Sequence, residues 1–428
     1  MLLIQNAHVI DPASGRSEEC DILVQGERIA QIGKSLPAPE GECGIIDARG
    51  LVAAPGLVDV HVHFREPGFT YKEDIHTGAA AAARGGFTTV VMMANTKPAI
   101  DNRETLAYVL EKGRRTGIHV LSCASVTVGL GGRELTSMEE LAELGAAGFT
   151  DDGIPLLEES LVRRAMERAA ALDKPVSLHE EDPGLIENNG IHRGKASEYF
   201  QMGGSPREAE ISLVERDLRL ALETGARVNI QHISARESVE LLRQAKKQGA
   251  AVHGEATPHH FTLTQEAAIR YGTLAKMNPP LREEADRQAI IQGLADGTID
   301  MIATDHAPHA PWEKDRPVAQ APSGIIGLET ALPLAITGLV DTGCLSMEQL
   351  IGLMSTNPAR LYGLDAGYLA QGGPADIVLL DPGAEVVPGE YASRSSNTPF
   401  TGWRLRGRVV KTIASGRVVY CNGCGNVF

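Results

Sequence analysis

Residues 57–68 read LVDVHVHFREPG, a short apolar run that ends in two histidines and an arginine. The β-branched character of the run predicts a β-strand. Because successive side chains of a strand alternate between its two faces, His61 and His63 point to the same side. Two imidazoles on one face can bind a single metal ion, and Arg65 follows close enough to reach whatever is bound beside it.

This stretch opens the first of eight similar units. In each unit a β-branched run is joined to a longer segment of helical periodicity, which is typical of parallel strands connected by crossover helices. One such helix is predicted in SPREAEISLVERDLRLALETG (205–225), where Gly225 supplies the stop. The strand-like runs are LVDVHVH, FTTVVMMAN, IHVLSCASV, AAGFTDD, KPVSLHE, ARVNIQHIS, AAVHGEATPHH and DMIATDHAPH.

Eight βα units close most naturally into a (β/α)8 barrel. The alternative, an open doubly wound sheet, requires a phosphate-binding glycine fingerprint after its first strand. The nearest match, GLGGRE at 129–134, lacks both the spacing and the flanking helix. The sequence therefore predicts an α/β barrel.

The two ends of the chain have a different character. They contain short strands with turn residues between them, such as DILVQGERIAQIG near the start and ADIVLLDP near the end. Neither end has enough strands to be stable alone, so we expect the two to pair into one small β-sandwich domain beside the barrel. We place the first part of that domain at 1–55, the barrel at 56–360, and the second part with a C-terminal tail at 361–428. The metal ligands should lie outside the sandwich domain.

Composition narrows the class of partner. The 428 residues carry a formal net charge of −15 and no Lys/Arg-rich run, which argues against binding to nucleic acid or to an anionic membrane. The opening MLLIQNAHVIDP lacks the unbroken apolar region of a signal peptide, and later apolar runs are too short to span a membrane. We expect a soluble, cytoplasmic protein that acts on small molecules. The terminal CNGC at 421–424 lacks a second CxxC pair, and a loose tail is preferred over a zinc or redox site.

Polar residues gather where the predicted strands end. In a barrel of this type the chemistry sits at the C-terminal ends of the strands, so these side chains should face one rim. A single histidine there is usually a hydrogen-bonded core or surface residue. A group of buried imidazoles and carboxylates is costly unless its members are paired or bind a metal. In chain order, the residues at the strand ends are His61, His63, Asn95, Asp152, His179, His232, Asp305 and His309.

Imidazole and carboxylate ligands without thiolates favour a catalytic Zn²⁺ site with an open water position, and Mn²⁺ or Co²⁺ as substitutes. Such an ion makes hydroxide available at neutral pH, so the expected chemistry is hydrolysis. Arg65 is too cationic to be a ligand and is well placed to receive an anionic group of the substrate. Its alternative role is a structural ion pair with Glu66 or another surface acid. Asn95 and Asn278 each have an amide able to orient a substrate, or to cap a turn.

With these residues in place, the chain resembles the dihydroorotases of the amidohydrolase superfamily, in particular the bacterial class that works as a separate chain. The motifs occur in family order over nearly the whole length: DVHVHFREPG, GGFTTVVMMANTKP, FTDDG, EATPHH, KMNPPLR, DGTIDMIATDHAPH and NTPFTGW. The resemblance implies a (β/α)8 barrel with a flanking β-sandwich. It also implies reversible hydrolysis of the cyclic amide of (S)-dihydroorotate to N-carbamoyl-L-aspartate in pyrimidine biosynthesis, with one or two zinc ions per chain.

The resemblance also assigns roles to residues of this chain. Asp305 would take a proton from the attacking water and pass it to the departing nitrogen. Asp152 would occupy the position where many relatives carry a carboxylated lysine, with Asp151 as the competing candidate. The family often has a bulkier residue where Ser323 stands, so the contact expected there is with the backbone. The implied metal ligands are His61, His63, Asp152, His179, His232 and Asp305, and the implied substrate contacts are His63, Arg65, Asn95, Asn278, His309, Ser323 and Gly324.

Two rival functions are distinguishable from the sequence. A hydantoinase or allantoinase should have a lysine at the bridging position and no arginine after the paired histidines, and this chain has the reverse. A non-catalytic subunit that only scaffolds aspartate transcarbamoylase should have lost metal ligands, and all six are present here. We expect an active enzyme that forms a homo-oligomer. A complex with aspartate transcarbamoylase is a further expectation.

Overall fold

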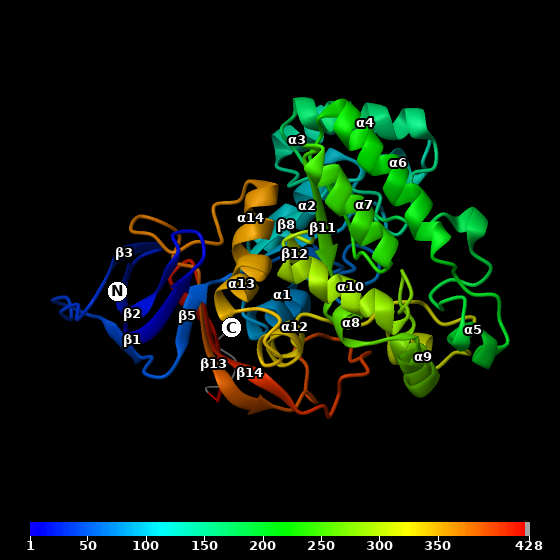
Figure 1. Cartoon of the computed structure of the whole chain (residues 1–428). Helices are drawn as coiled ribbons and strands as arrows, with labels where there is room; N and C mark the ends of the chain where they lie inside the picture. Colours follow the sequence, from blue (N-terminus) through cyan, green and yellow to red (C-terminus); the bar gives the residue numbers. More distant parts are fainter. Residues whose placement is uncertain (424–428) are drawn as a thin grey trace.

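The computed structural model describes residues 1–423 of the chain, and its centre is a barrel of parallel strands wrapped by helices (Figure 1). Hydrogen-bond registers join β6 to β7 and β8 in one parallel sheet, and β9 to β10, β11 and β12 in a second. The barrel strands are β6 (Leu57–Val62), β7 (Phe87–Met92), β8 (His119–Ser122), β9 (Val176–Leu178), β10 (Val228–Ile230), β11 (Val252–Ala256) and β12 (Met301–Ile302).

Two short connections close these sheets into a barrel. Phe149 forms parallel bridges to Ala124 on one side and to Val176 on the other, so the predicted fourth strand is present as a single bridging residue. On the opposite side, Val62 bridges to His306, which carries the end of the eighth strand back to the first. The predicted eight-unit order is thus confirmed.

The fourth strand is short because a side chain replaces part of its backbone pairing. Asp151 turns its carboxylate toward the preceding unit, where Oδ1 accepts from the amide nitrogens of Val126 (2.7 Å) and Thr127 (3.0 Å). The hydroxyl of Thr127 donates to the other carboxylate oxygen. Those amides therefore need no strand carbonyl, and regular pairing ends beyond Phe149.

Helices follow the strands and pack around the barrel. Helix α6 ends at Gly225, whose left-handed backbone (φ 69°) provides the predicted stop. The helices between strands are α1 (Ile75–Arg84), α2 (Arg103–Gly113), α3 (Met138–Leu144), α4 (Glu159–Ala171), α6 (Glu208–Thr224), α7 (Arg236–Lys247), α10 (Glu284–Ala295) and α12 (Ala331–Ala335). Shorter helices are α5 (Lys195–Phe200), α8 (Pro258–Thr262), α9 (Gln265–Tyr271), α11 (Pro311–Lys314), α13 (Met347–Ile351) and α14 (Asn357–Tyr362).

Both ends of the chain contribute to one further sheet, drawn in blue and red in Figure 1. Its strands follow the order β15-β14-β13-β5-β1-β2-β3, with β4 paired to β1. Antiparallel pairing of β5 with β13, for example Ala54 with Val378, joins the N-terminal strands to the C-terminal ones. The strands are β1 (Leu2–Asp11), β2 (Arg16–Gln25), β3 (Arg28–Gly33), β4 (Gly44–Asp47), β5 (Val52–Pro55), β13 (Ile377–Val386), β14 (Leu405–Ala414) and β15 (Arg417–Cys421).

A barrel with a flanking β unit made from both chain ends confirms the predicted fold class. The division near residues 55 and 361 stays a prediction. Of the terminal CNGC motif, Cys421 is the last residue of β15, whereas Cys424 lies outside the described residues. Among residues 1–423, no helix combines the length and apolarity needed to cross a bilayer.

The barrel interior is closed at one end by helix α14. Val58 and Val91, from strands β6 and β7, share an apolar cluster with Leu361 and Tyr362 of α14. The Tyr362 hydroxyl lies 2.7 Å from Ser177 Oγ on β9. With the N-terminal end of the barrel packed in this way, a pocket is possible only at the opposite end, where the strands terminate.

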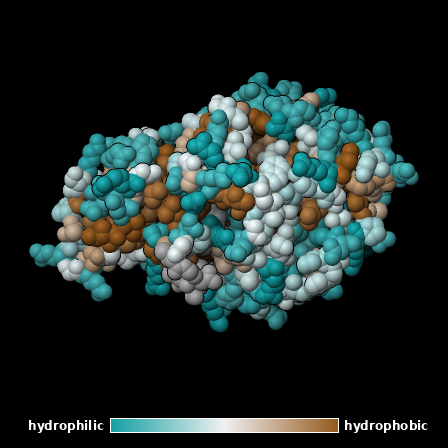
Figure 2. All heavy atoms as spheres, turned by 90° about the horizontal axis from the view of Figure 1, so that it is seen from below, coloured by the Kyte–Doolittle hydropathy of each residue, from teal (hydrophilic) through white to brown (hydrophobic). Residues whose placement is uncertain are grey.

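On the face seen in Figure 2, apolar side chains gather toward the β unit at the left.

Candidate metal centre and substrate pocket

The residues predicted from the sequence come together at the C-terminal ends of the barrel strands. They surround one pocket of about 180 Å³. His61 lies beneath the pocket and is fully buried. The pocket is lined by His63, Arg65, Asn95, Asp152, Gly153, His179, His232, Asn278, Asp305, Ala307, His309, Ser323 and Gly324.

Asp152 is the centre of the polar cluster. It belongs to two groups of possible metal ligands, one with His61 and His63 and the other with His179 and His232. Within each group the ligand atoms lie within 4.8 Å of one another. Asp152 Oδ1 is 3.3 Å from His61 Nε2, and Oδ2 is 3.5 Å from His63 Nε2. A single carboxylate therefore faces both pairs of imidazoles.

Asp305 approaches the same cluster from the end of β12. Its Oδ1 lies 3.0 Å from His63 Nε2 and 3.5 Å from His61 Nε2. This carboxylate borders the pocket, so it can meet both a cation held by the histidines and a molecule bound above them. Asp151, the competing candidate, is directed away from the cluster and binds the backbone of residues 126 and 127.

The imidazoles are oriented by oxygen atoms on their far sides. His61 donates from Nδ1 to Glu255 Oε1 (2.5 Å), and His63 donates from Nδ1 to Asn95 Oδ1 (3.0 Å). His179 Nε2 faces Glu181 Oε2 at 3.4 Å. A proton on each of these nitrogens leaves the other ring nitrogen as a lone pair turned toward Asp152. This tautomer is the one that a metal ligand requires.

Two features fit a divalent cation in this cluster. His61 Nε2 is buried and lacks a hydrogen-bond partner among the described residues. His179 Nδ1 and His232 Nε2 face each other at 2.9 Å, although both nitrogens are suited to a shared partner. Burying such groups without a partner is costly, and a cation between them would remove that cost.

Electrostatics at the cluster point the same way. Burial would raise the pKa of Asp152, but the nearby His61 and His63 outweigh burial and hold the pKa well below its usual range. Burial together with the neighbouring His179 and His61 lowers the pKa of His232 well below its usual value. An ionised Asp152 and a neutral His232 are the forms in which these residues bind metal, whereas Glu255 and Asp152 outweigh burial and raise the pKa of His61, so a bound cation would take the place of its proton.

The opposite side of the pocket carries a cation. Arg65 Nε donates to the carbonyl oxygen of Pro308 (3.3 Å), and burial lowers the pKa of Arg65. The alternative partner, Glu66, is taken by Lys112, by the Tyr108 hydroxyl and by the backbone of helix α1. The guanidinium of Arg65 is therefore available to an anionic group in the pocket.

Asn278, Asn95 and His309 differ in how free they are to bind a substrate. Asn278 Oδ1 is buried with no hydrogen-bond partner among the described residues, so it can accept from a bound molecule. The Asn95 amide is already engaged, since Nδ2 donates to Asp152 Oδ2 (3.0 Å) while Oδ1 accepts from His63. His309 Nε2 donates to Ser323 O (2.8 Å), and Lys72 Nζ lies 3.4 Å from its Nδ1. These internal bonds were not predictable from the sequence.

Three of the predicted residues have a left-handed backbone. The φ angles are 61° for Arg65, 31° for His232 and 48° for Asp305. None is a glycine, and this conformation is costly for such residues. All three residues line the pocket. The presence of several strained residues around one pocket supports a functional site.

Glu255 and Glu181 are supporting residues that sequence analysis missed. Glu255 is fully buried on β11, and besides His61 it accepts from Asn229 Nδ2 (3.0 Å) and the His232 amide (3.2 Å). One signal was available, because a carboxylate stands in the middle of the strand-like run AAVHGEATPHH. Glu181 gave no comparable signal, because its surroundings in the sequence are acidic and polar.

Comparisons with known proteins give the same class of enzyme. A family model described as "Dihydro-orotase-like" matches residues 50–238. A dihydroorotase from Clostridioides difficile is 54% identical over 420 residues, which are 98% of this chain and 100% of that protein. A dihydroorotase from Clostridium acetobutylicum is 49% identical over 422 residues, with 98% and 99% covered.

Among solved structures, an L-hydantoinase (dihydropyrimidinase) from Arthrobacter aurescens is similar to this chain. The TM-score is 0.89 at 26% identity, and the match covers 99% of this chain and 96% of that one. A D-hydantoinase from a Thermus species gives a TM-score of 0.86 at 25% identity, with 99% and 96% covered.

Proposed function

This chain belongs to the dihydroorotase family, and from that premise we propose how its residues carry out the reaction. The enzyme is a cyclic amidohydrolase that opens the ring of dihydroorotate to N-carbamoyl-L-aspartate, reversibly, in pyrimidine biosynthesis. Identity of about half the residues over nearly the full length favours this activity over that of the hydantoinases, which are about a quarter identical.

The observation that carries the mechanism is the shared position of Asp152 between two groups of imidazoles. We propose that His61, His63, Asp152, His179, His232 and Asp305 hold one or two divalent cations, with zinc favoured by a ligand set of imidazole and carboxylate. A bound cation of this kind acidifies water and polarises a carbonyl group. Metal measured on the purified protein, together with ring opening of dihydroorotate by the same sample, tests this assignment.

Asp305 is the proposed proton carrier. Its carboxylate lies beside the ligands and also borders the pocket, so it can accept a proton from the attacking water. The same carboxylate can then donate that proton to the departing ring nitrogen, because the ring lies over the same pocket. A group that moves a proton in this way must touch both the water and the leaving nitrogen, and Asp305 has that position.

Arg65 and Asn278 are the proposed anchors of the substrate. Arg65 would pair with the carboxylate of dihydroorotate, and the unpartnered Oδ1 of Asn278 would accept from a ring N–H. The backbone amide of Ser323 would offer a donor on the same wall. Gly324 would contribute a surface without a side chain, because its amide donates to Lys276 O (2.8 Å) and its carbonyl accepts from Lys314 and Asn397. Holding the ring at two points aligns the amide carbonyl with the cation and with Asp305.

Replacing Arg65 with Met tests whether this residue binds the substrate carboxylate. Loss of a desolvated charge pair costs about 2 kcal/mol or more, so kcat/KM for dihydroorotate should fall at least about 30-fold. 5,6-Dihydrouracil has the same ring without the carboxylate, and its kcat/KM should change far less. An equal loss on both substrates would show that Arg65 does not bind the carboxylate.

Assembly and location of the enzyme stay predictions. We propose a homo-oligomer that acts in the cytoplasm. A complex with aspartate transcarbamoylase is a further expectation. Light scattering on the purified enzyme, alone and with that partner, tests both kinds of assembly.

A further inference from the structure

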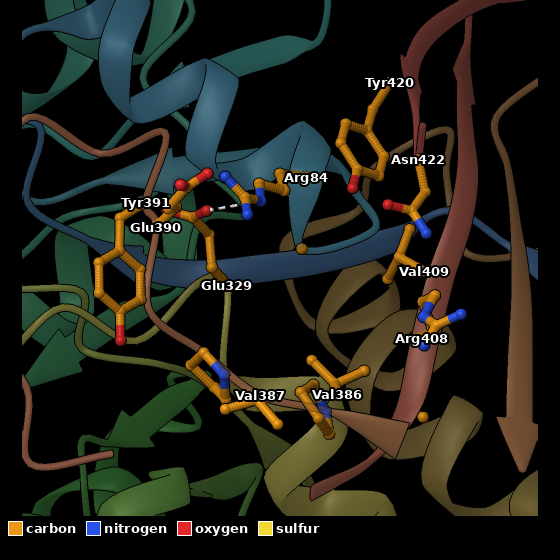
Figure 3. Close-up of a pocket in the computed structure, with 14 residues that line it drawn as sticks. Arg84, Glu329, Val386, Val387, Glu390, Tyr391, Arg408, Val409, Tyr420 and Asn422 are labelled. Atoms are coloured by element: carbon orange, nitrogen blue, oxygen red, sulfur yellow. Dashed lines mark ion pairs between the residues drawn. The ribbon is translucent and has the colours of Figure 1, made fainter. Parts of the chain in front are cut away.

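The segment between β13 and β14 leaves the β unit and returns to it after passing the pocket. We call residues 387–404 the return segment. Figure 3 shows where it begins, with Val387, Glu390 and Tyr391 beside the ion pair of Arg84 and Glu329. Glu329 accepts from the amides of Ala392 (3.0 Å) and Ser393 (3.1 Å), while Arg84 Nε lies 3.2 Å away. The first half of the return segment is thus attached to the barrel.

A second buried carboxylate holds the middle of the return segment. Glu73 is fully buried and accepts from the Ser393 hydroxyl and from the Arg394 amide (3.1 Å). Glu73 Oε2 also lies 3.3 Å from His306 Nε2, next to Asp305 at the end of the eighth strand. The segment is therefore joined to the strand that carries the proposed proton carrier.

The return segment reaches the pocket wall at Asn397, whose side-chain amide makes three hydrogen bonds. Oδ1 accepts from the His309 amide (3.0 Å), and Nδ2 donates to the carbonyls of Ala307 and Gly324 (3.1 Å each). Its own carbonyl accepts from the Ile326 amide (3.0 Å). The side chain and backbone of this one buried residue thereby tie together two stretches, 307–309 and 324–326, that contribute to one wall of the pocket.

Two buried lysines hold the remainder of that wall. Lys276 Nζ donates to the carbonyls of Val318 (2.8 Å) and Ala321 (2.7 Å). Lys314 Nζ donates to the carbonyls of Pro322 (2.8 Å) and Gly324 (3.0 Å). These lysines fix the loop internally. Asn397 joins it to the stretch that bears His309, together with two direct bonds, from the Ala307 amide to Ile325 O (2.8 Å) and from His309 Nε2 to Ser323 O (2.8 Å).

We propose that Asn397 is a positioning residue that sets the affinity for the substrate carboxylate. It does so by holding the His309 stretch and Gly324 at a fixed separation beside Arg65, whose Nε donates to the Pro308 carbonyl of the same stretch (3.3 Å). This inference rests on the proposed role of that wall in binding the carboxylate. Asn397 touches neither the cation ligands nor the substrate, so its loss should weaken binding of the charged group and leave the chemical step largely intact.

The test compares Asn397→Asp and Asn397→Ser with the wild type. Asp has the same shape as Asn but has no N–H for the Ala307 and Gly324 carbonyls, and Ser keeps one hydroxyl without adding a charge. KM for dihydroorotate should rise about tenfold, because two buried hydrogen bonds are lost and the Ala307 carbonyl loses the donor that Asn397 provides, while the Gly324 carbonyl keeps only Lys314. The kcat should stay within about threefold of the wild type. For 5,6-dihydrouracil, measured with enzyme in excess, kcat/KM should change less than about twofold.

Thr398→Ala is the matched control. Thr398 is also buried in the return segment, but within residues 1–423 its hydroxyl makes one hydrogen bond, which it accepts from the nearby Phe400 amide (3.3 Å). It should lower stability without changing the preference for the charged substrate. Metal content and melting temperature of each variant show whether the fold and the cation site are retained.

The outcomes separate the inference from the proposed function. Equal losses on both substrates in the Asn397 variants, or the same rise in KM in Thr398→Ala, would overturn the inference. If Arg65→Met shows no preference for the charged substrate, the proposed role of the whole wall fails. If Arg65→Met behaves as expected and neither Asn397 variant changes KM, only the role of Asn397 fails.

Discussion

Replacing Glu255 with Gln tests how the cation site is tuned. Glu255 is fully buried and meets His61 Nδ1 at 2.5 Å, Asn229 Nδ2 at 3.0 Å and the His232 amide at 3.2 Å. Gln has the same shape and can still accept from His61. Its new amide can donate to Asn229 if that side chain turns over, because Asn229 Oδ1 has no partner among the described residues. The substitution therefore removes the negative charge with little change of geometry.

The magnitude follows from the role of that charge. A carboxylate behind a ligating imidazole makes the ring a stronger ligand and fixes its orientation, and mutating such partners costs about 10- to 100-fold in metal affinity. This corresponds to about 1.4–2.7 kcal/mol. Glu255 contacts the ring of one proposed ligand, His61, and the backbone amide of another, His232. We therefore expect an effect near the upper end of the range.

The assay is competition for zinc or cobalt against a chelator of known affinity. Glu329→Gln is the matched control, because Glu329 is a buried carboxylate that binds backbone amides away from the cluster. Its metal affinity should equal that of the wild type. If Glu255→Gln also retains wild-type affinity within about twofold, the charge behind His61 has no part in tuning the site, and the reasoning from its contacts is wrong.

Three further substitutions have defined outcomes. Asp305→Asn should lower kcat by about 10²–10⁴-fold with the fold retained, and normal turnover would remove Asp305 from proton transfer. Gly324→Ala places a Cβ 2.6 Å from Ala307 Cβ at a residue with φ +108°. Urea unfolding should therefore show a free energy of unfolding about 1–3 kcal/mol lower. Gly249→Ala, at φ +86° with open space around it, should lower stability less. Burial and the nearby Lys276 lower the pKa of Lys314 to about 7, so the unfolded chain binds more protons and the free energy of unfolding should rise from about pH 7 to 10.5. That rise should be missing from Lys314→Met, and an unchanged pH dependence would contradict the assignment.

Much of the fold was predictable because the barrel repeats one pattern. Each strand-like run ends in polar residues and is followed by helical periodicity, so the order of units and their closure followed from the sequence. The fourth strand was the exception. Its pairing is reduced to Phe149 because the Asp151 carboxylate takes amides that a strand carbonyl would otherwise bind, and no propensity scale encodes that replacement.

The residues that face the pocket were predictable, but those behind them were not. His61 and His63 share a face by strand periodicity, and the strand ends are where a barrel places its chemistry. The residues behind the pocket, Asn397, Lys276 and Glu255, contact partners that are far away in the chain. His61 and Glu255, for example, are 194 positions apart. Partners at such separations depend on tertiary packing, which a single sequence does not specify.

The electrostatics of the pocket resolve a conflict between the composition and the substrate. A chain with a net charge of −15 repels an anion at long range, yet both dihydroorotate and its product are anionic. Charges beyond about 8–10 Å are largely screened by salt, so the immediate wall decides binding. That wall holds cations: besides burial, the neighbouring Arg65 and Lys72 lower the pKa of His309. An anion bound beside Arg65 relieves the mutual repulsion of these groups. The acidity of the whole chain is therefore compatible with an acidic substrate, because the buried cations nearest the pocket set the local field.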